Sequence, residues 1–252
     1  MSFFTAYTDI SGKDKDYFIV SGATISTDIQ WLELEEKWKR VLEPLGIKIF
    51  HAADCASSKG EFTGWDYEKR FLTYSKLTKI MIKHIKFVIV HIVSSEDYLK
   101  LTSKEHEDIL RTPTPCGYCQ GNCAKDLIEW NKKTGGKLAI ISELGDKLRS
   151  DFIVALKRAT EDENLREKYG IYHLGEGLKK DFVPLQTSDF LAYEWFRFFT
   201  DYKKYKSLDM RVPLKVLRGK IPMQVRSVNN SITRKVLQLP TVHELDVFLK
   251  RK

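Results

Sequence analysis

The sequence predicts an α/β protein in which helices flank a mixed β-sheet, with further helices inserted between the strands. Short segments rich in β-branched and aromatic residues alternate with longer ones whose apolar residues recur about every three to four positions. The segments 85–93 and 138–142 are almost entirely apolar, as expected of strands buried on both faces. The length of 252 residues suits one domain, and no linker or internal repeat divides it.

The first half of the chain predicts a β-hairpin followed by helices. Two segments rich in aromatic and β-branched residues, 3–7 and 17–25, surround a polar turn. Thr27 and its neighbours offer N-cap side chains for a helix at 29–42. The elements expected next are a short strand at 47–50, a long helix at 66–83, the strand at 85–93 and a helix or turn-rich connection at 96–110.

The second half predicts two strands and three helices. The helices are expected at 116–132, 151–169 and 184–200, and the strands at 138–142 and, at the sheet edge, 170–174. From Tyr205 on, the chain is basic and less regular. A single domain spanning 1–252 with a basic C-terminal extension from about residue 202 is therefore expected.

The charge of the chain favours a polyanionic partner. Lysine and arginine outnumber aspartate and glutamate by 42 to 34, which gives a net charge of +8. The excess lies late in the chain, where Asp209 is the single acid between Tyr202 and Arg234. RNA or DNA is the natural partner of such a surface, since neutralised phosphates supply most non-specific nucleic-acid affinity. A merely solvated surface is the alternative.

Neither a membrane span nor a secretion signal is expected. The longest apolar run, 87–93, is far shorter than the roughly 18 residues that a span needs. Charged residues from Asp9 to Asp16 interrupt any apolar core of a signal peptide. A cytoplasmic protein with reduced cysteines is the expectation.

Three carboxylates occupy positions where a charge is costly unless it is paired or bound to a metal ion. Asp9 follows a strand, Glu143 ends an apolar strand, and Asp189 lies on a helix dominated by large apolar residues. Converging carboxylates repel one another, and a divalent cation resolves that conflict. Mg²⁺ or Mn²⁺ is the expected ion because hard oxygen ligands suit hard cations. Taken singly, Asp9 and Asp189 would instead be turn or helix caps.

Four segments of the chain resemble a known family. Residues 7–12 (Tyr-Thr-Asp-Ile-Ser-Gly) resemble the Tyr-x-Asp-Glu-Ser-Gly opening of the family called domain of unknown function 3800. Residues 49–54 look like its His-x-x-Asp segment, and residues 60–65 resemble the loop that follows that segment. Residues 184–194 are similar to its Leu-Gln-x-x-Asp-x-x-Ala-Tyr signature. The resemblance implies a ribonuclease-H-like fold, in which a strand-borne Asp, a strand-end Glu and a helix-borne Asp follow in that order.

Ile10 departs from the family pattern, which usually carries Glu directly after the first Asp. If that Glu bound the metal, activity here would be weakened or lost. Because neighbouring side chains of a strand point to opposite faces, Asp9 and residue 10 are not expected to bind one ion together.

Two residues are expected beside the three acids. Asp54 is a fourth candidate ligand, and His51 is either an orienting group or proton shuttle, or a hydrogen-bonded histidine of the strand end. Asp146 would be a further ligand or a turn residue. Glu194 lies about 140° round the helix from Asp189, so it is expected to face elsewhere.

A cysteine cluster is a weaker signal. Cys116, Cys119 and Cys123 lie within eight residues, and a structural Zn²⁺ is conceivable if Cys55 or a histidine supplies a fourth ligand. The second half of a paired-cysteine zinc motif is missing.

These observations favour a divalent-metal-dependent nuclease that hydrolyses phosphodiester bonds in nucleic acid. Asp9, Glu143, Asp189 and Asp54 would be its metal ligands, and the same four residues with His51 its catalytic residues. The alternative is a non-catalytic nucleic-acid or protein-binding module that retains the fold, which Ile10 would favour. Oligomeric state is not predicted.

Overall fold

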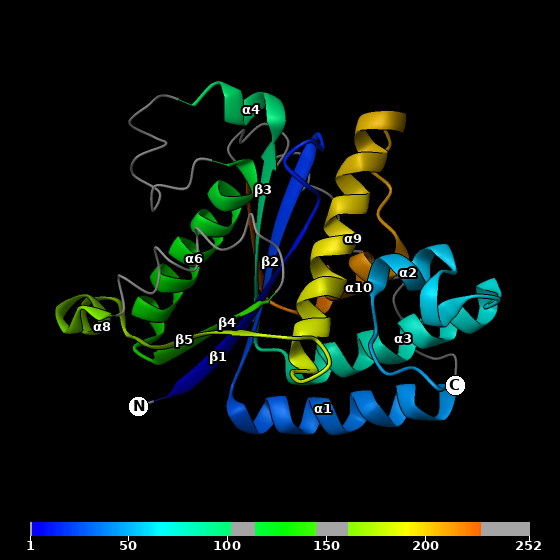
Figure 1. Ribbon diagram of the computed structural model, residues 1–252, viewed down its shortest axis with the longest axis horizontal. Helices are drawn as coiled ribbons and strands as arrows, with labels where there is room; N and C mark the ends of the chain where they lie inside the picture. Colours follow the sequence, from blue (N-terminus) through cyan, green and yellow to red (C-terminus); the bar gives the residue numbers. More distant parts are fainter. Residues whose placement is uncertain (1, 102–113, 145–160, 228–252) are drawn as a thin grey trace.

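The computed structural model describes residues 2–101, 114–144 and 161–227, which form an α/β fold with a six-stranded mixed sheet between two layers of helices (Figure 1). The expected class, a mixed sheet flanked by helices, is confirmed. The strands are β1 (Phe3–Ser11), β2 (Phe18–Ser26), β3 (Phe87–Ser94), β4 (Lys137–Glu143), β5 (Ile171–Gly177) and β6 (Met223–Ser227).

Helices separate all of these strands except β1 and β2, which form a hairpin. The helices are α1 (Asp28–Leu42), α2 (Ala52–Ser57), α3 (Tyr67–His84), α4 (Ser95–Leu99), α6 (Pro115–Thr134), α8 (Glu163–Tyr169), α9 (Pro184–Tyr205) and α10 (Val212–Lys220), with 3-10 turns at Glu43–Leu45 and Gly60–Phe62. In the described ranges, no helix is long and apolar enough to cross a membrane.

The strand order places three parallel strands side by side. It is β5-β4-β1-β2-β3-β6, in which β1, β2 and β3 are successively antiparallel while β4 runs parallel to both β1 and β5. The carboxyl ends of β1, β4 and β5 therefore lie at one edge of the sheet. In open α/β sheets this is where ligands commonly bind.

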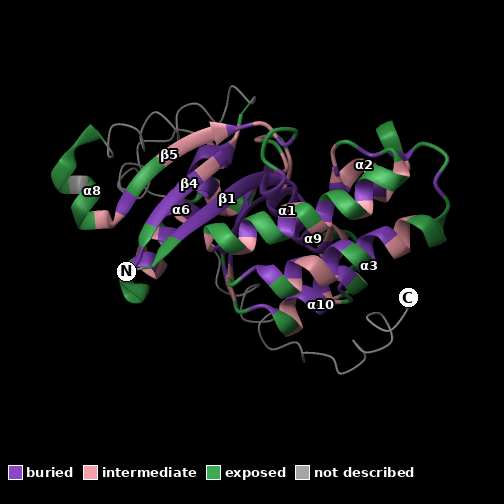
Figure 2. Cartoon of the chain, turned by 90° about the horizontal axis from the view of Figure 1, so that it is seen from below, coloured by how far each residue is buried: buried purple, intermediate pink, exposed green. Residues whose placement is uncertain are grey.

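Alternating side chains divide the core between the two faces of the sheet. Tyr7, Phe18 and Val20 pack with α9, α1 and α3, whereas Ala6 and Ile25 pack beneath α6. Both faces of β1 and β4 are covered, and β5 is the more exposed edge (Figure 2). Burial on both faces explains why residues 138–141 of β4 are all apolar.

Small residues let α9 approach the sheet closely. A Cβ atom at Gly22 of β2 would lie 3.2 Å from the backbone nitrogen of Ala192. Two residues along β2, the hydroxyl oxygens of Thr24 and Thr187 lie 2.8 Å apart in a buried hydrogen bond. These contacts fix α9 across β1 and β2, beside Asp9, which pairs with Gly22 in the ladder.

Two expectations about elements are wrong. Residues 47–50 form no strand, because the Phe50 N–H donates to the side chain of Gln186 instead of to a neighbouring strand. The chain after Tyr205 is not irregular throughout: α10 packs on α3 and α9, and β6 pairs in parallel with β3. The parts of the helices expected at 96–110 and 151–169 that cover 102–110 and 151–160 lie outside the described residues.

Part of the basic surplus beyond Tyr202 stabilises the fold. Nη1 of Arg211, just before α10, lies 3.0 Å from Oε1 of Glu194, whose side chain is fully buried in α9. Arg226 of β6 lies 2.7 Å from Asp126 of α6, and Lys215 pairs with Asp209.

As expected, Glu194 faces away from Asp189. Burial raises the pKa of Glu194 from 4.5 to about 7, although Arg211 opposes the shift.

Stability should therefore fall as pH rises through the titration of Glu194. A folded-state pKa above the unfolded value means that the folded chain holds an extra proton between about pH 4.5 and about pH 7, so this contribution is lost across that window. We expect the free energy of urea unfolding to fall between about pH 5 and about pH 8 in the wild type by about 3 kcal/mol more than in Glu194→Gln. A wild-type-to-variant difference that is constant with pH would contradict this.

Candidate active site

The register of the parallel strands β1 and β4 brings Asp9 and Glu143 together. Thr8 pairs with Ser142, and their hydroxyl oxygens form a 2.7 Å hydrogen bond on the α6 face of the sheet. The next residue of each strand must then point to the α9 face. Asp9 and Glu143 consequently project side by side from the carboxyl ends of two neighbouring strands.

Asp189 reaches the same place from the helix that covers this face. It is 5% exposed and lies in the second turn of α9. Its Oδ2 accepts a 2.7 Å hydrogen bond from the N–H of Ala52, the first residue of α2. The carboxylate thus holds α2 against α9, while its other oxygen, Oδ1, lies 2.9 Å from Nζ of Lys179.

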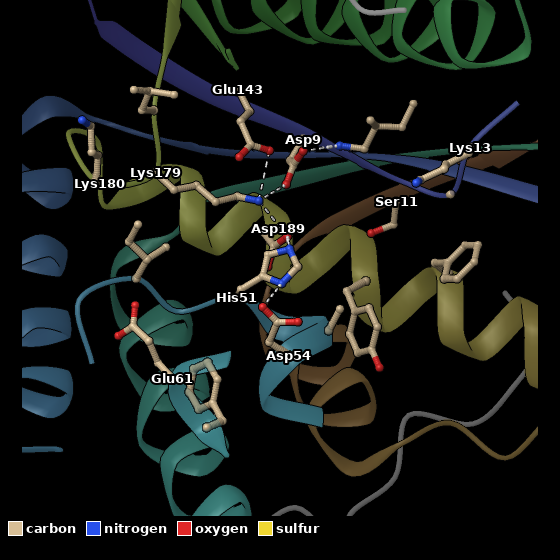
Figure 3. Close-up of a pocket in the computed structure, with 18 of the residues that line it drawn as sticks. Asp9, Ser11, Lys13, His51, Asp54, Glu61, Glu143, Lys179, Lys180 and Asp189 are labelled. Carbon is tan, nitrogen blue, oxygen red and sulfur yellow. Dashed lines mark hydrogen bonds and ion pairs between the residues drawn. The ribbon is translucent and has the colours of Figure 1, made fainter. Parts of the chain in front are cut away.

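A lysine joins the three carboxylates. Nζ of Lys179 lies 3.0 Å from Oδ2 of Asp9, 3.0 Å from Oε2 of Glu143 and 2.9 Å from Oδ1 of Asp189 (Figure 3). The Lys179 side chain is 8% exposed. We call these four residues the Lys179 cluster.

The turn after β5 delivers Lys179 to the cluster. β5 ends at Gly177, where an added Cβ would come within 2.4 Å of the Phe182 ring that folds back over it. Lys179 was not among the residues that the sequence singled out, since the adjacent Lys180 looks the same there. The available signal was position: Lys179 lies five residues after the edge strand expected at 170–174.

The cluster shifts the protonation of its members. Burial, followed by the nearby Asp9, raises the pKa of Glu143, and burial also raises the pKa of Asp189 although Lys179 opposes it. Burial alone would lower the pKa of Lys179, but the three carboxylates outweigh it and raise that pKa above its ordinary value. Lys179 is therefore the permanent cation of the cluster.

His51 and Asp54 extend the cluster toward solvent. Nε2 of His51 lies 3.6 Å from Oδ1 of Asp189, and its Nδ1 lies 3.1 Å from Oδ2 of Asp54 (Figure 3). Both side chains are about two-fifths exposed. Asp54 thus contacts His51, whereas the other three acids contact Lys179 directly. Its role as a metal ligand stays a prediction, as does that of Asp146, which lies outside the described residues.

Gln186 connects the segments that carry these residues. Its Oε1 accepts hydrogen bonds from Nε1 of Trp38, at 2.8 Å, and from the N–H of Phe50, at 3.0 Å. Its Nε2 donates to the carbonyl oxygen of Lys179, at 3.0 Å. The Gln and Asp of the Leu-Gln-x-x-Asp segment, three residues apart on one helix, therefore position Lys179, His51 and α2.

The side chain of Ile10 lies on the opposite face of the sheet from the cluster. It packs with Ile19, Val93, Cys116 and Cys119, while its backbone N–H donates 2.7 Å to Oδ1 of Asp9. The expected separation of Asp9 from its neighbour is confirmed. A side chain at position 10 does not share the space around Lys179.

The cluster opens into a cavity of about 730 Å³. Its walls come from the β1–β2 turn, α2, the 3-10 turn at 60–62, the turn after β5, and α9. Lys13 and Lys180 line it together with the acids (Figure 3). This volume is within the range of small-molecule sites.

The donors of the cluster suit a hard cation. Three carboxylate oxygens meet around one point, and oxygen ligands are those that Mg²⁺ and Mn²⁺ prefer. The oxygens surround Nζ at about 3 Å, whereas Mg²⁺ needs about 2.1 Å. Within the described ranges no group of three His, Cys, Asp or Glu side chains is spaced for a metal ion. Asp9, Glu143 and Asp189 could hold one if Lys179 withdrew and they closed by about 1 Å.

The cysteines are buried in the core. Cys116, Cys119 and Cys123 lie on the face of α6 that packs on the sheet, and Cys55 lies in the opposite core. The Sγ of Cys119 donates to the carbonyl oxygen of His91 at 3.2 Å, and burial raises its pKa well above the ordinary value. These contacts explain the thiols as packing residues, and zinc binding stays a prediction.

No protein-family model matches the chain, and no curated protein matches it either. The likeness to domain of unknown function 3800 therefore rests on the four short segments described above.

Replacing Gln186 should loosen the site. Gln186→Met keeps the volume but leaves the Trp38 and Phe50 donors and the Lys179 carbonyl without this partner. We expect a loss of about 2–4 kcal/mol in the free energy of urea unfolding. Gln186→Glu retains the two accepted bonds but buries a charge and turns an oxygen toward the Lys179 carbonyl, so it should lose at least as much. If Gln186→Met changes stability by under about 0.5 kcal/mol, the connecting role is wrong.

Proposed function

We propose that the protein is a divalent-metal-dependent nuclease with a ribonuclease-H-like arrangement of acids. The observation that carries this proposal is the convergence of Asp9, Glu143 and Asp189 on one buried cation at the floor of an open cavity. Strand-borne Asp, strand-end Glu and helix-borne Asp occur in the order that the family resemblance implies. A mixed sheet flanked by helices is compatible with that fold.

Each residue of the cluster has a distinct role in this proposal. Asp9, Glu143 and Asp189 would hold Mg²⁺ or Mn²⁺, which when bound supplies an activated water and neutralises charge on the phosphate. The Ala52 N–H holds Asp189 at Oδ2, so its Oδ1, which now faces Lys179, would be the oxygen that binds the ion once Lys179 withdraws. His51, between Asp189 and Asp54, would hold a proton at Nε2 or Nδ1 near the reacting phosphate.

Lys179 sets a condition on this activity. Its ammonium holds the point that a metal ion would share, so the ion must displace it. Lys179 lies in the turn between β5 and α9, where only the side chain needs to swing away. Once released, the ammonium would remain in the cavity as a cation for the phosphate.

Lys179 also favours a second candidate function, a binding module without catalysis. Here the ammonium permanently neutralises the acids, and the cavity recognises nucleic acid or protein without hydrolysis. Ile10 no longer supports this alternative, because its side chain lies on the other face of the sheet.

Removing one acid should separate the two functions. We expect Asp9→Asn to reduce Mn²⁺-dependent cleavage of labelled RNA or DNA by at least about 100-fold, since it removes a charged ligand. Calorimetry should detect Mn²⁺ binding to the wild type but not to this variant. Glu61→Gln, a cavity-lining acid that no contact joins to Lys179, is the matched control. A wild type that neither binds Mn²⁺ nor cleaves any substrate would exclude the nuclease.

Removing the lysine should expose a metal site. Lys179→Met leaves the buried carboxylates of Asp9 and Asp189 and the partly exposed one of Glu143 without their counterion. We therefore expect a loss of about 3–5 kcal/mol in the free energy of unfolding near neutral pH. Added MnCl2 should raise the melting temperature of this variant more than that of the wild type, because the ion takes the vacated place. Lys180→Met is the control. Equal melting shifts in all three proteins would show that the ion does not take the place of Lys179.

A further inference from the structure

A second hollow continues the cavity along α9. It has a volume of about 390 Å³ and is lined by the β1–β2 turn and the C-terminal half of α9, which lie beside each other in Figure 1. Asp16 and Phe196 line both hollows, so the two adjoin. We call the combined hollow the α9 groove.

One face of α9 forms the floor of this groove. The residues that line it are spaced by four, three, four and three positions, which is one stripe of an α-helix: Asp189, Tyr193, Phe196, Thr200 and Lys203. At about 1.5 Å per residue the stripe is about 21 Å long. Stacked nucleotides are spaced about 3.4 Å apart along a strand, so the groove accommodates at most about six.

Charge changes sign along the stripe. The end at Asp189 holds the Lys179 cluster, and the far end carries Lys203 and Lys204, both exposed in the last turn of α9. Lys13, in the β1–β2 turn, lines the groove between them. Asp16 lines the hollow at this end, and its Oδ2 accepts the Lys13 N–H at 2.8 Å; Asp201, on the same part of α9, also acts on Lys204. The end at Lys203 and Lys204 therefore suits a phosphate group, and the end at the Lys179 cluster suits a phosphate group that is bound to a metal ion.

Aromatic side chains lie between the two ends. Tyr193 and Phe196 are partly exposed on the stripe, and Tyr17 lies opposite them with Nζ of Lys203 over its ring. Aromatic faces beside a row of cations bind unpaired bases by stacking, whereas paired bases do not offer their faces. The combination is typical of single-stranded nucleic-acid sites.

We propose that the α9 groove binds single-stranded nucleic acid, with phosphates at Lys203 and Lys204 and bases on Phe196 and Tyr193, and leads the strand to the Lys179 cluster. This inference names the substrate class of the proposed nuclease and rests on that function only for the fate of the strand. Binding itself needs no metal ion.

The test measures binding without metal. Fluorescence anisotropy in EDTA would follow fluorescein-labelled oligothymidylate and oligouridylate and a duplex of the same length. We expect Lys203→Glu/Lys204→Glu to weaken single-strand binding at least about tenfold and to reduce the slope of log affinity against log salt by about 1.4. Phe196→Ala should weaken it about tenfold with little change in slope.

The matched control is Lys132→Glu/Lys168→Glu. These lysines also flank a tyrosine ring, that of Tyr169, but they line a separate hollow of about 570 Å³ near α8. They change the net charge by the same amount, so we expect only a small, general loss of affinity. Circular dichroism melting would establish that each variant is folded.

Three outcomes would overturn the proposal: equal losses in the two lysine pairs, duplex bound as tightly as single strand, or no binding of either oligonucleotide by the wild type. Oligonucleotide binding that depends on Lys203 and Lys204 without Mn²⁺-dependent cleavage would retain the groove and reject the nuclease. Mn²⁺-dependent cleavage that is unchanged by Lys203→Glu/Lys204→Glu at low substrate concentration would retain the nuclease and reject the groove.

Discussion

The ion cluster around Lys179 is the constraint on which this end of the molecule depends. Two buried carboxylates and a partly exposed one, from two strands and a helix, would repel one another in a medium that screens charge poorly. A single ammonium within about 3 Å of all three offsets part of that repulsion. Because salt bridges of this kind require accurate geometry, the ends of β1, β4 and β5 and the start of α9 must all be held in place.

Buried polar contacts and close packing provide that geometry. Thr8 and Ser142 fix the register of β1 against β4, so that Asp9 and Glu143 emerge together. Gly22 allows the backbone of α9 to approach β2. Gln186 then ties the backbones of Lys179 and Phe50 to the same helix. The acids meet because apolar packing and hydrogen bonds bear the cost of bringing them together.

The cluster also relates stability to the proposed activity. An internal ammonium stabilises the protein in the absence of metal, and the same ammonium competes with any divalent ion for the three carboxylates. Metal affinity would then equal the intrinsic affinity of the acids reduced by the free energy of displacing Lys179. A polyanionic strand in the α9 groove would favour this displacement, since its phosphates offer the released ammonium a new partner.

The sequence by itself determined the class of fold and three of the four residues of the cluster. Apolar periodicity locates most strands and helices, and an acid that ends a buried strand or interrupts an apolar helix is conspicuous because such a charge needs a partner. Only the tertiary structure decided that the partner of these acids is Lys179. Lys179 looks like Lys180 in the sequence and differs from it only through the turn that buries it. Likewise, 47–50 has a strand's composition, but the Phe50 N–H pairs with a side chain 136 residues away. β6 is five residues long, and its pairing with β3 is a contact between distant parts of the chain that no local pattern encodes.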